Sequence, residues 1–203
     1  MVHRIYIALL ISFCSFSWFT SLYPESIPVD RVQYSIEKST IKRIQKPLEV
    51  RTDRETLEYF IGHVEELTRH GKDFNRKELI LEVKGNGRYG IEMPSKHVTG
   101  EFELVERQPH KVTYMGRGNA DMFFNFSGVI VLDINYSTKK DEIGNYENVE
   151  TSVYLKFDNA FFALLAKAAS PILNRQLDKF ITKFSMKTKK VVEAAYASKK
   201  GIK

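Results

Sequence analysis

The chain has 203 residues, of which 43% are hydrophobic and 28% charged, and these values are typical of one globular domain with an appendage. The formal charge of +6 is compatible with an acidic partner or an anionic membrane surface, but no basic run is interleaved with aromatic residues, so we expect no nucleic-acid partner. The single cysteine, Cys14, excludes internal disulfides and cysteine zinc sites from the rest of the chain.

An uncharged apolar stretch occupies residues 5–24 and follows His3 and Arg4. A positive start followed by an apolar segment is typical of an export signal, and about 20 residues also suffice to cross a bilayer as a helix. Both a cleaved signal peptide and an uncleaved membrane anchor, formed by residues 1–24, therefore stay open. In either case we expect an exported protein, periplasmic or secreted, with a linker over residues 25–31 and one domain over residues 32–203.

The first part of that domain is predicted to contain a strand and a helix. Residues 32–51 are predicted to be extended, because Val32, Tyr34 and Ile36 alternate with polar residues. Residues 52–70 are predicted to form a helix, with Thr52 and Glu55 as a capping box and apolar residues at helical spacing behind them.

A run of strands follows. Asn86-Gly87 between two strand-like segments predicts a β-hairpin, since both residues accept positive φ angles. The same loop matches G-x-G-x-x-G, but a dinucleotide site requires a helix to begin there, and strand-like residues follow instead. Further strands are predicted over 100–107, 111–118, 122–136 and 149–157, with a polar loop over 137–148.

Residues 159–197 are predicted to form a long amphipathic helix, on which Phe161, Leu165 and Ile172 belong to one apolar stripe. Pro171 has no backbone N–H, so it either kinks this helix or begins a second one after Ser170, and we favour one kinked helix. The near absence of a linker after residue 157 predicts that the last strand is a sheet edge, from which the helix folds back across the concave face.

The predicted order, with consecutive antiparallel strands and segregated helices, defines an α+β fold. This order, together with VTYMGRG, FFNFSGVIVL and TSVYLKFDNAFFALLAKAASPILNRQLDKFITKF, resembles the START-like (SRPBCC) superfamily of Bet v 1, polyketide cyclases and coenzyme Q-binding proteins. The resemblance covers residues 32–184. It implies a helix-grip fold, in which a curved antiparallel sheet of about six to seven strands wraps around a long C-terminal helix and encloses an apolar cavity. The apolar N-terminal segment and the long first segment depart from the family pattern.

The resemblance also implies a ligand-binding surface on the inward faces of the strands and the last helix. The predicted inward strand residues carry no charge, which suits a lipid, a quinone or another apolar molecule, with Tyr89 and Tyr114 as polar handles. An alternative is that these side chains simply fill a packed core. The predicted ligand-binding residues are Tyr89, Ile91, Met93, Phe102, Tyr114, Phe124, Phe126, Ile130, Phe161, Leu165 and Ile172.

Catalytic and metal-binding motifs are not found in the sequence. The five histidines have no metal-ligand spacing, and there is no nucleophile elbow or P-loop, so we expect no cofactor, no metal and no catalytic residue. Lysines near the C-terminus indicate a solvated helix end or contact with an anionic membrane. The leading hypothesis is a non-catalytic binder of an apolar ligand; the alternatives are a cyclase- or hydrolase-like enzyme and a protein-interaction module with a filled core.

Overall fold

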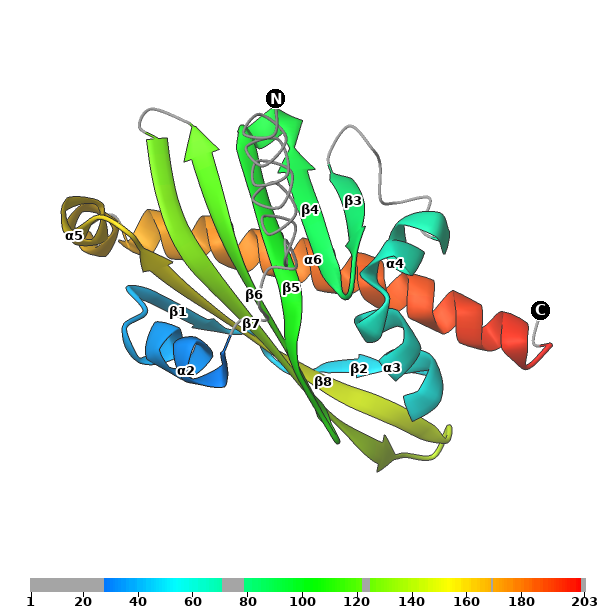
Figure 1. Ribbon diagram of the computed structural model, residues 1–203. Coiled ribbons are helices and arrows are strands. Elements are labelled where there is room, and N and C mark those ends of the chain that lie inside the picture. The colour runs from blue at the N-terminus through cyan, green and yellow to red at the C-terminus, as the bar shows by residue number, and fades with distance from the viewer. Residues whose placement is uncertain (1–27, 71–78, 122–124, 169, 202–203) are drawn as a thin grey trace, which may run out of the picture.

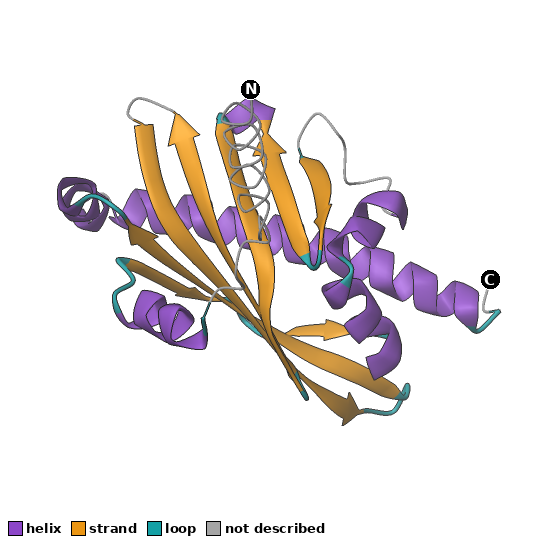
Figure 2. Cartoon of the chain, viewed as in Figure 1, coloured by secondary structure: helices purple, strands orange, loops and turns teal. Residues whose placement is uncertain are grey.

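The computed structural model describes residues 28–70, 79–121, 125–168 and 170–201. Eight strands form one antiparallel sheet in the order β1-β8-β7-β6-β5-β4-β3, and β2 also pairs with β8 (Figure 1, Figure 2). The strands are β1 (Ile41–Ile44), β2 (Leu48–Val50), β3 (Ile80–Gly85), β4 (Arg88–Met93), β5 (Val98–Gln108), β6 (Lys111–Asp121), β7 (Asn125–Lys140) and β8 (Asn145–Phe157). The predicted α+β class is confirmed, with more strands than the six to seven expected.

Helices lie on both sides of this sheet, with α6 behind the strands and α2 in front of them in Figure 1. We call these two sides the α6 face and the α2 face. The helices are α2 (Val29–Glu37), α3 (Arg54–Gly62), α4 (Val64–His70), α5 (Ala160–Ala168) and α6 (Ser170–Lys199), with a short 3-10 turn η1 (Pro94–Lys96) between β4 and β5. Within the described ranges, no helix is long and apolar enough to cross a bilayer. The predicted export segment, residues 5–24, lies outside those ranges.

The α6 face carries the larger hydrophobic core. Helices α3 and α4 and the C-terminal half of α6 cover it, and Val192 and Val112 are fully buried there. The α2 face carries a smaller core, in which Val32 of α2 packs with Met115, Val131 and Tyr154 of the sheet. The central strands therefore have apolar side chains on both faces, each face covered by a different part of the chain.

Polar contacts fix α6 along the edge formed by β1 and β2. Arg43 of β1 donates two hydrogen bonds to Asp178, of 2.7 and 2.5 Å. Further along, Ser185 Oγ lies 2.7 Å from Gln45 Oε1, and the backbone N–H of Arg51 donates to Glu193 at 2.8 Å. Because residue numbers rise together in both segments, α6 runs in the same direction as the β1–β2 segment.

The beginning of the domain differs from the prediction. Residues 29–37 form α2 and not a strand, because Val32 and Ser35 are buried at helical spacing against the α2 face. The next helix is capped by Asp53, whose carboxylate accepts from the backbone N–H of Thr56 at 2.8 Å, so the predicted Thr52/Glu55 capping box is wrong. It also ends at Gly62, and α4 follows after His63.

The hairpins agree better with the sequence. Asn86 and Gly87 adopt φ angles of 53° and 70° between β3 and β4, as predicted. The predicted polar loop over 137–148 is wrong, because β7 continues to Lys140 and β8 begins at Asn145. Cross-strand pairs such as Thr138 with Glu147 extend the ladder nearly to the turn, where Asp141 Oδ1 accepts from the N–H groups of Ile143 and Gly144.

One expectation for the C-terminal part is also wrong. Strand β8 is not a sheet edge, because it pairs with β7 on one side and with β1 and β2 on the other. Helical structure extends over Ala160–Ala168 and Ser170–Lys199, and the chain changes direction between these two segments, next to Pro171 (Figure 1). Pro171 lies in the first turn of α6, where its missing N–H costs little because those N–H groups have no partner within the helix.

Candidate functional site

Two adjacent rows of residues cross the α6 face of the sheet, and we call them the glycine rows. Registers across five strand pairs define the first row as Tyr89, Phe102, Gly116, Ile130, Leu155 and Ile41. The second row consists of Leu81, Ile91, Gly100, Gly118, Gly128 and Phe157. Three neighbouring strands contribute only glycine to the second row, so these positions themselves place no side chain on this face.

These glycines also allow the sheet to bend. A Cβ atom on Gly116 would lie 2.5 Å from the carbonyl oxygen of Glu101, and one on Gly128 would lie 2.7 Å from that of Lys156. Contacts this short with backbone of the adjacent strand exclude any side chain without local movement. At Gly116 and Gly128 the adjacent strand therefore leaves no room for a side chain on the α6 face.

The N-terminal half of α6 is bound to β1, the strand at one end of the first glycine row. Asp178 is bound to Arg43, and Asn174 precedes Asp178 by about one helical turn, or 6 Å. Ile41 precedes Arg43 by two residues, or about 6.6 Å along β1. Asn174 therefore lies one turn before the residue of α6 that binds β1.

Asn174 supplies a polar atom at this position. It shares one side of α6 with Leu177, which is half-buried, and with Ile181, which is buried. Its Oδ1 atom is buried and has no hydrogen-bond partner among the described residues. A buried amide oxygen without a partner is unfavourable, and a hydroxyl or another donor placed here would satisfy it.

Packing is looser here than at the other end of α6. Ile130, in the first glycine row, remains 40% exposed, whereas Val191 and Val192 at the far end of the helix are buried. Leu177 and Phe180 are half-buried. The principal feature of this site is therefore an apolar surface at Ile130 that α6 leaves partly exposed.

Two of the predicted ligand-binding residues instead belong to the packed core. Tyr114 is buried and its hydroxyl donates to the carbonyl oxygen of Ile61 at 2.5 Å, while burial raises its pKa well above the ordinary value. Tyr89 is buried against Phe102, with ring centroids 5.1 Å apart. Burial, followed by a hydrogen bond to Glu65, raises the pKa of Tyr89 to about 12. Both hydroxyls are thus used to hold α3 and α4 on the sheet.

The other predicted residues are dispersed. Ile91 belongs to the second glycine row, and Met93 pairs with Val98 nearer the strand ends. Phe126 pairs with Ala120 in the register of β6 and β7, and Phe124 lies outside the described residues. The predicted stripe through Phe161, Leu165 and Ile172 assumed one helix, and the break between α5 and α6 separates its members. These three side chains are exposed by 61%, 38% and 69%.

Neither the aligned glycines nor Asn174 was expected from the sequence. Gly116 and Gly118 alternate within one strand, and this spacing places both on the same face. The alternation was a usable signal, but the alignment with Gly100 and Gly128 depends on strand register. Asn174 carries no such signal, because a polar residue within an amphipathic helix is ordinarily assigned to the solvent side.

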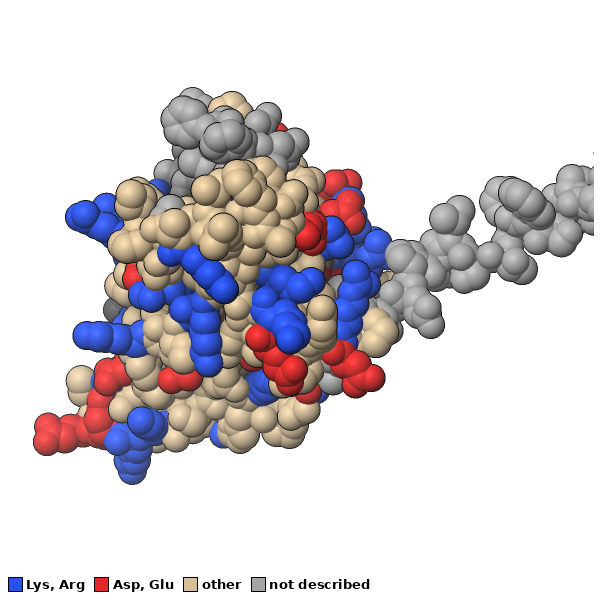
Figure 3. Space-filling model, turned by 90° about the vertical axis from the view of Figure 1, so that its left-hand side faces the viewer, with Lys and Arg blue, Asp and Glu red and all other residues tan. Residues whose placement is uncertain are grey.

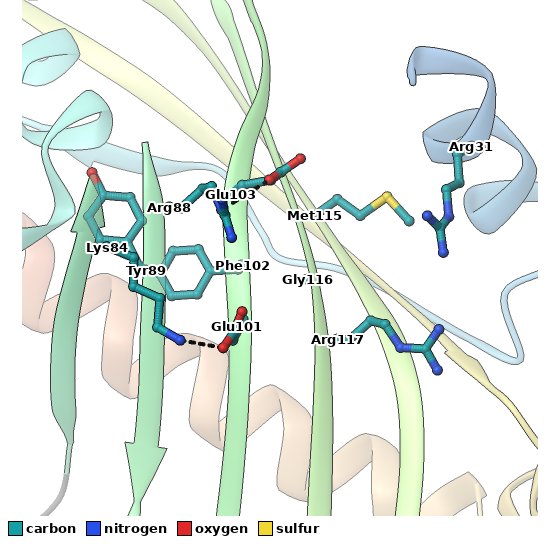
Figure 4. Close-up of a pocket in the computed structure, with 10 residues that line it drawn as sticks. All are labelled: Arg31, Lys84, Arg88, Tyr89, Glu101, Phe102, Glu103, Met115, Gly116 and Arg117. Carbon is teal, nitrogen blue, oxygen red and sulfur yellow. Dashed lines mark hydrogen bonds and ion pairs between the residues drawn. The ribbon is translucent and has the colours of Figure 1, made fainter. Parts of the chain in front are cut away.

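The α2 face has two depressions of a different character. One, of about 170 Å³, lies between Arg31 of α2 and strands β4 to β6 (Figure 4). The other, of about 510 Å³, extends over β3 to β6. Lys84, Arg88 and Arg117, which line the first depression, each contact a carboxylate. Tyr89 and Phe102 also border it, but its charged lining suits a polar partner and not an apolar ligand.

Apart from Tyr89, the glycine rows contain no ionisable side chain. Glu147 is fully buried, and its Oε1 atom accepts from Thr138 at 2.7 Å. Thr138 is eight residues from Ile130 in β7, roughly 26 Å along the strand. Among the described residues, no group of three or more His, Cys, Asp or Glu is placed to hold a metal ion.

Comparisons with known proteins give a likeness in fold. A conserved protein from Geobacillus kaustophilus superposes with a TM-score of 0.53 at 11% sequence identity, covering 77% of this chain and 97% of that one. A hypothetical protein from Helicobacter pylori aligns with 77% of this chain and 85% of its own, at 13% identity and a TM-score of 0.41. No family model and no curated protein matches the chain. The Geobacillus protein and this chain share a fold, and their identity is too low to carry a function.

Proposed function

We propose that this chain is a START-like, non-catalytic binder of an apolar ligand such as a lipid or quinol, held between the glycine rows and the N-terminal half of α6. The sheet and the long C-terminal helix are consistent with the helix-grip arrangement that this proposal requires. The observation that carries the proposal is that Gly100, Gly118 and Gly128 place no side chain on the α6 face, together with a helix segment that leaves Ile130 partly exposed.

Asn174 narrows the chemistry of the ligand. Its unpartnered Oδ1 accepts a hydrogen bond, so the ligand donates one, as a hydroxyl does. The remaining surface is apolar, and its removal from water drives binding at about 25 cal/mol per Å². Export through residues 5–24, as a signal peptide or an anchor, belongs to the same proposal.

The enzyme alternative lacks support at this site. General acid or base chemistry needs an ionisable group within hydrogen-bond reach of the bound molecule. The residues of the two glycine rows carry none other than the Tyr89 hydroxyl, whose raised pKa keeps it neutral. A binding role therefore fits the described residues better than catalysis.

The test blocks the proposed site with a bulky substitution and compares how the variant and the wild-type full chain bind a fluorescent alcohol, 1-pyrenebutanol. Ile130→Trp places a large side chain on the first glycine row, and we expect it to weaken saturable binding at least tenfold. Val83→Trp is the matched control, because Val83 is an aliphatic residue of the same face, 53% exposed, that pairs with Tyr89 at the β3 edge, four strands away from Ile130.

Native mass spectrometry of the purified full chain complements this titration, since a bound lipid or quinol is released and identified by its mass. The proposal is wrong if the wild-type chain shows no saturable binding and carries no extractable apolar molecule. Equal binding by the Ile130→Trp and Val83→Trp variants also contradicts the location.

A further inference from the structure

A second apolar surface lies on the outer side of the two C-terminal helices. It consists of Phe161, Leu164, Leu165, Ile172 and Leu173, and we call it the α5–α6 apolar face. These side chains are exposed by 61%, 66%, 38%, 69% and 37%, respectively. Five large apolar residues exposed within a stretch of 13 exceed the scattered exposure usual on a protein surface.

Most of this surface points away from the sheet. On α5 the buried residue is Ala166, and Phe161 and Leu164 lie on the other side of the helix. On α6 the less exposed side carries Asn174 and Leu177, and Ile172 lies opposite to Asn174. Neither the core nor the proposed ligand site accounts for these three exposed side chains.

The charge around this face is positive. Residues 159–180, which include the whole face, contain three Lys or Arg and a single acidic residue, Asp178. Asp178 is itself bound to Arg43. Lys167, Arg175 and Lys179 are exposed on α5 and the first turns of α6. Figure 3 shows this side of the molecule, with an uncharged area next to a band of Lys and Arg among which some Asp and Glu also lie.

An apolar centre with a cationic border is complementary to an anionic lipid surface. Phe and Leu side chains enter the boundary between headgroups and acyl chains, while Lys and Arg reach the lipid phosphates. A second copy of this chain is a poorer partner, because the same positive border would meet itself.

We propose that the α5–α6 apolar face docks onto an anionic lipid bilayer, with Phe161, Leu164 and Ile172 inserted and Lys167, Arg175 and Lys179 on the phosphates. In this orientation the glycine rows lie on the inner side of the same helices, close to the bilayer. Docking rests on the outer surface alone, so it is independent of the proposed ligand site, and the Ile130→Trp variant is expected to dock normally.

The experiment places one environment-sensitive NBD fluorophore on the full chain. The only cysteine is removed by Cys14→Ser, and Leu164→Cys then provides the labelling site. Ile143→Cys is the matched control: Ile143 is an aliphatic residue, 84% exposed, in the acidic β7–β8 turn at the opposite end of the sheet (Figure 1). Vesicles of phosphatidylcholine, with and without phosphatidylglycerol, serve as probes, and Ile172→Cys provides a second site on the face.

With vesicles that contain phosphatidylglycerol, we expect the emission of a label at residue 164 or 172 to shift to shorter wavelength and to be protected from aqueous quenchers. Without phosphatidylglycerol we expect neither change, and the label at residue 143 should remain exposed to water in both cases. Lys167→Glu with Lys179→Glu should weaken this response roughly tenfold. The proposal fails if the NBD labels at residues 164 and 172 keep the emission of a water-exposed fluorophore while the chain is bound to vesicles. It also fails if the label at residue 143 shifts by the same amount. A lipid-independent shift that grows with protein concentration would instead identify the face as a contact between copies.

Discussion

Three tyrosine hydroxyls connect the sheet to the helices that cover it. Tyr114 donates to the carbonyl oxygen of Ile61 in α3, and Tyr136 donates to Glu58 of the same helix at 2.9 Å. Tyr89 is hydrogen-bonded to Glu65 of α4. A buried hydroxyl requires such a partner, and here each partner comes from a helix far away in sequence. The sequence therefore identified Tyr89 and Tyr114 as inward residues but could not show what they bind.

These contacts predict the alkaline limit of stability. Burial and a carboxylate partner raise the pKa of Tyr89 and of Tyr136 to about 12, from an ordinary value of 10.0. The unfolded chain thus loses these protons at lower pH than the folded chain. Their contribution to the free energy of unfolding is complete below pH 10 and is lost as the pH rises toward about 12.

Urea unfolding as a function of pH, with phenolate absorbance recorded in parallel, measures this effect. We expect Tyr89→Phe and Tyr136→Phe to have a shallower loss of stability above pH 10 than the wild type. Tyr34→Phe, at an exposed tyrosine of α2, should keep the wild-type slope. Identical slopes in all variants would show that the buried hydroxyls do not set this limit.

At the scale of elements, the glycine rows predict a graded response to added methyl groups. The Cβ atom of Gly116→Ala would meet Glu101 oxygen at 2.5 Å and Phe102 Cβ at 2.7 Å, so the strands must separate. We expect a loss of about 1–3 kcal/mol in the free energy of unfolding, as for other overpacked sites.

Gly118→Ala is the control for that substitution. Its nearest contact would be 3.2 Å from the Thr99 oxygen, which a small shift relieves. Because alanine also reduces the entropy of the unfolded chain, this variant should be nearly neutral. If urea unfolding showed that Gly116→Ala and Gly118→Ala lower the free energy of unfolding equally, the close contact with the adjacent strand at Gly116 would not be the cause of the loss.

Element type was harder to predict at the start of the domain than elsewhere. Val32, Tyr34 and Ile36 alternate as in a strand, but Val32, Ser35 and Ile36 also match one face of a helix. In a segment this short, both periods fit. The choice depends on Met115, Val131 and Tyr154, which form the apolar surface that Val32 covers on the α2 face.

The whole molecule combines two unequal cores with one sparsely packed end. Strands β7 and β8 pair from Gly128 with Phe157 to Lys140 with Asn145, and their central residues are covered on both faces. Helix α5, by contrast, buries only Ala166. Regions with few buried contacts open at the lowest free energy.

Hydrogen exchange on the free full chain should follow this difference. We expect the slowest amides in β7 between residues 129 and 136 and in the β8 residues paired with them, and much faster exchange in α5. Mass spectrometry of peptic fragments after timed labelling resolves the two regions. If α5 in the free protein were as protected as β7, a contact covering its apolar residues would be required, and the exposed face would be wrong.

The sequence by itself determined the features that depend on local backbone preference and on periodic burial. Asn86-Gly87 specified a hairpin because both residues tolerate positive φ, and alternating apolar residues predicted the strands β4 to β8. Tertiary structure alone decided that α2 is a helix, that β8 lies inside the sheet and that the glycines align across three strands. It also decided that Phe161 and Ile172 face outward. The physical reason is that a periodic pattern shows which side of an element is apolar, whereas the segment that covers that side is chosen by packing between residues distant in the chain.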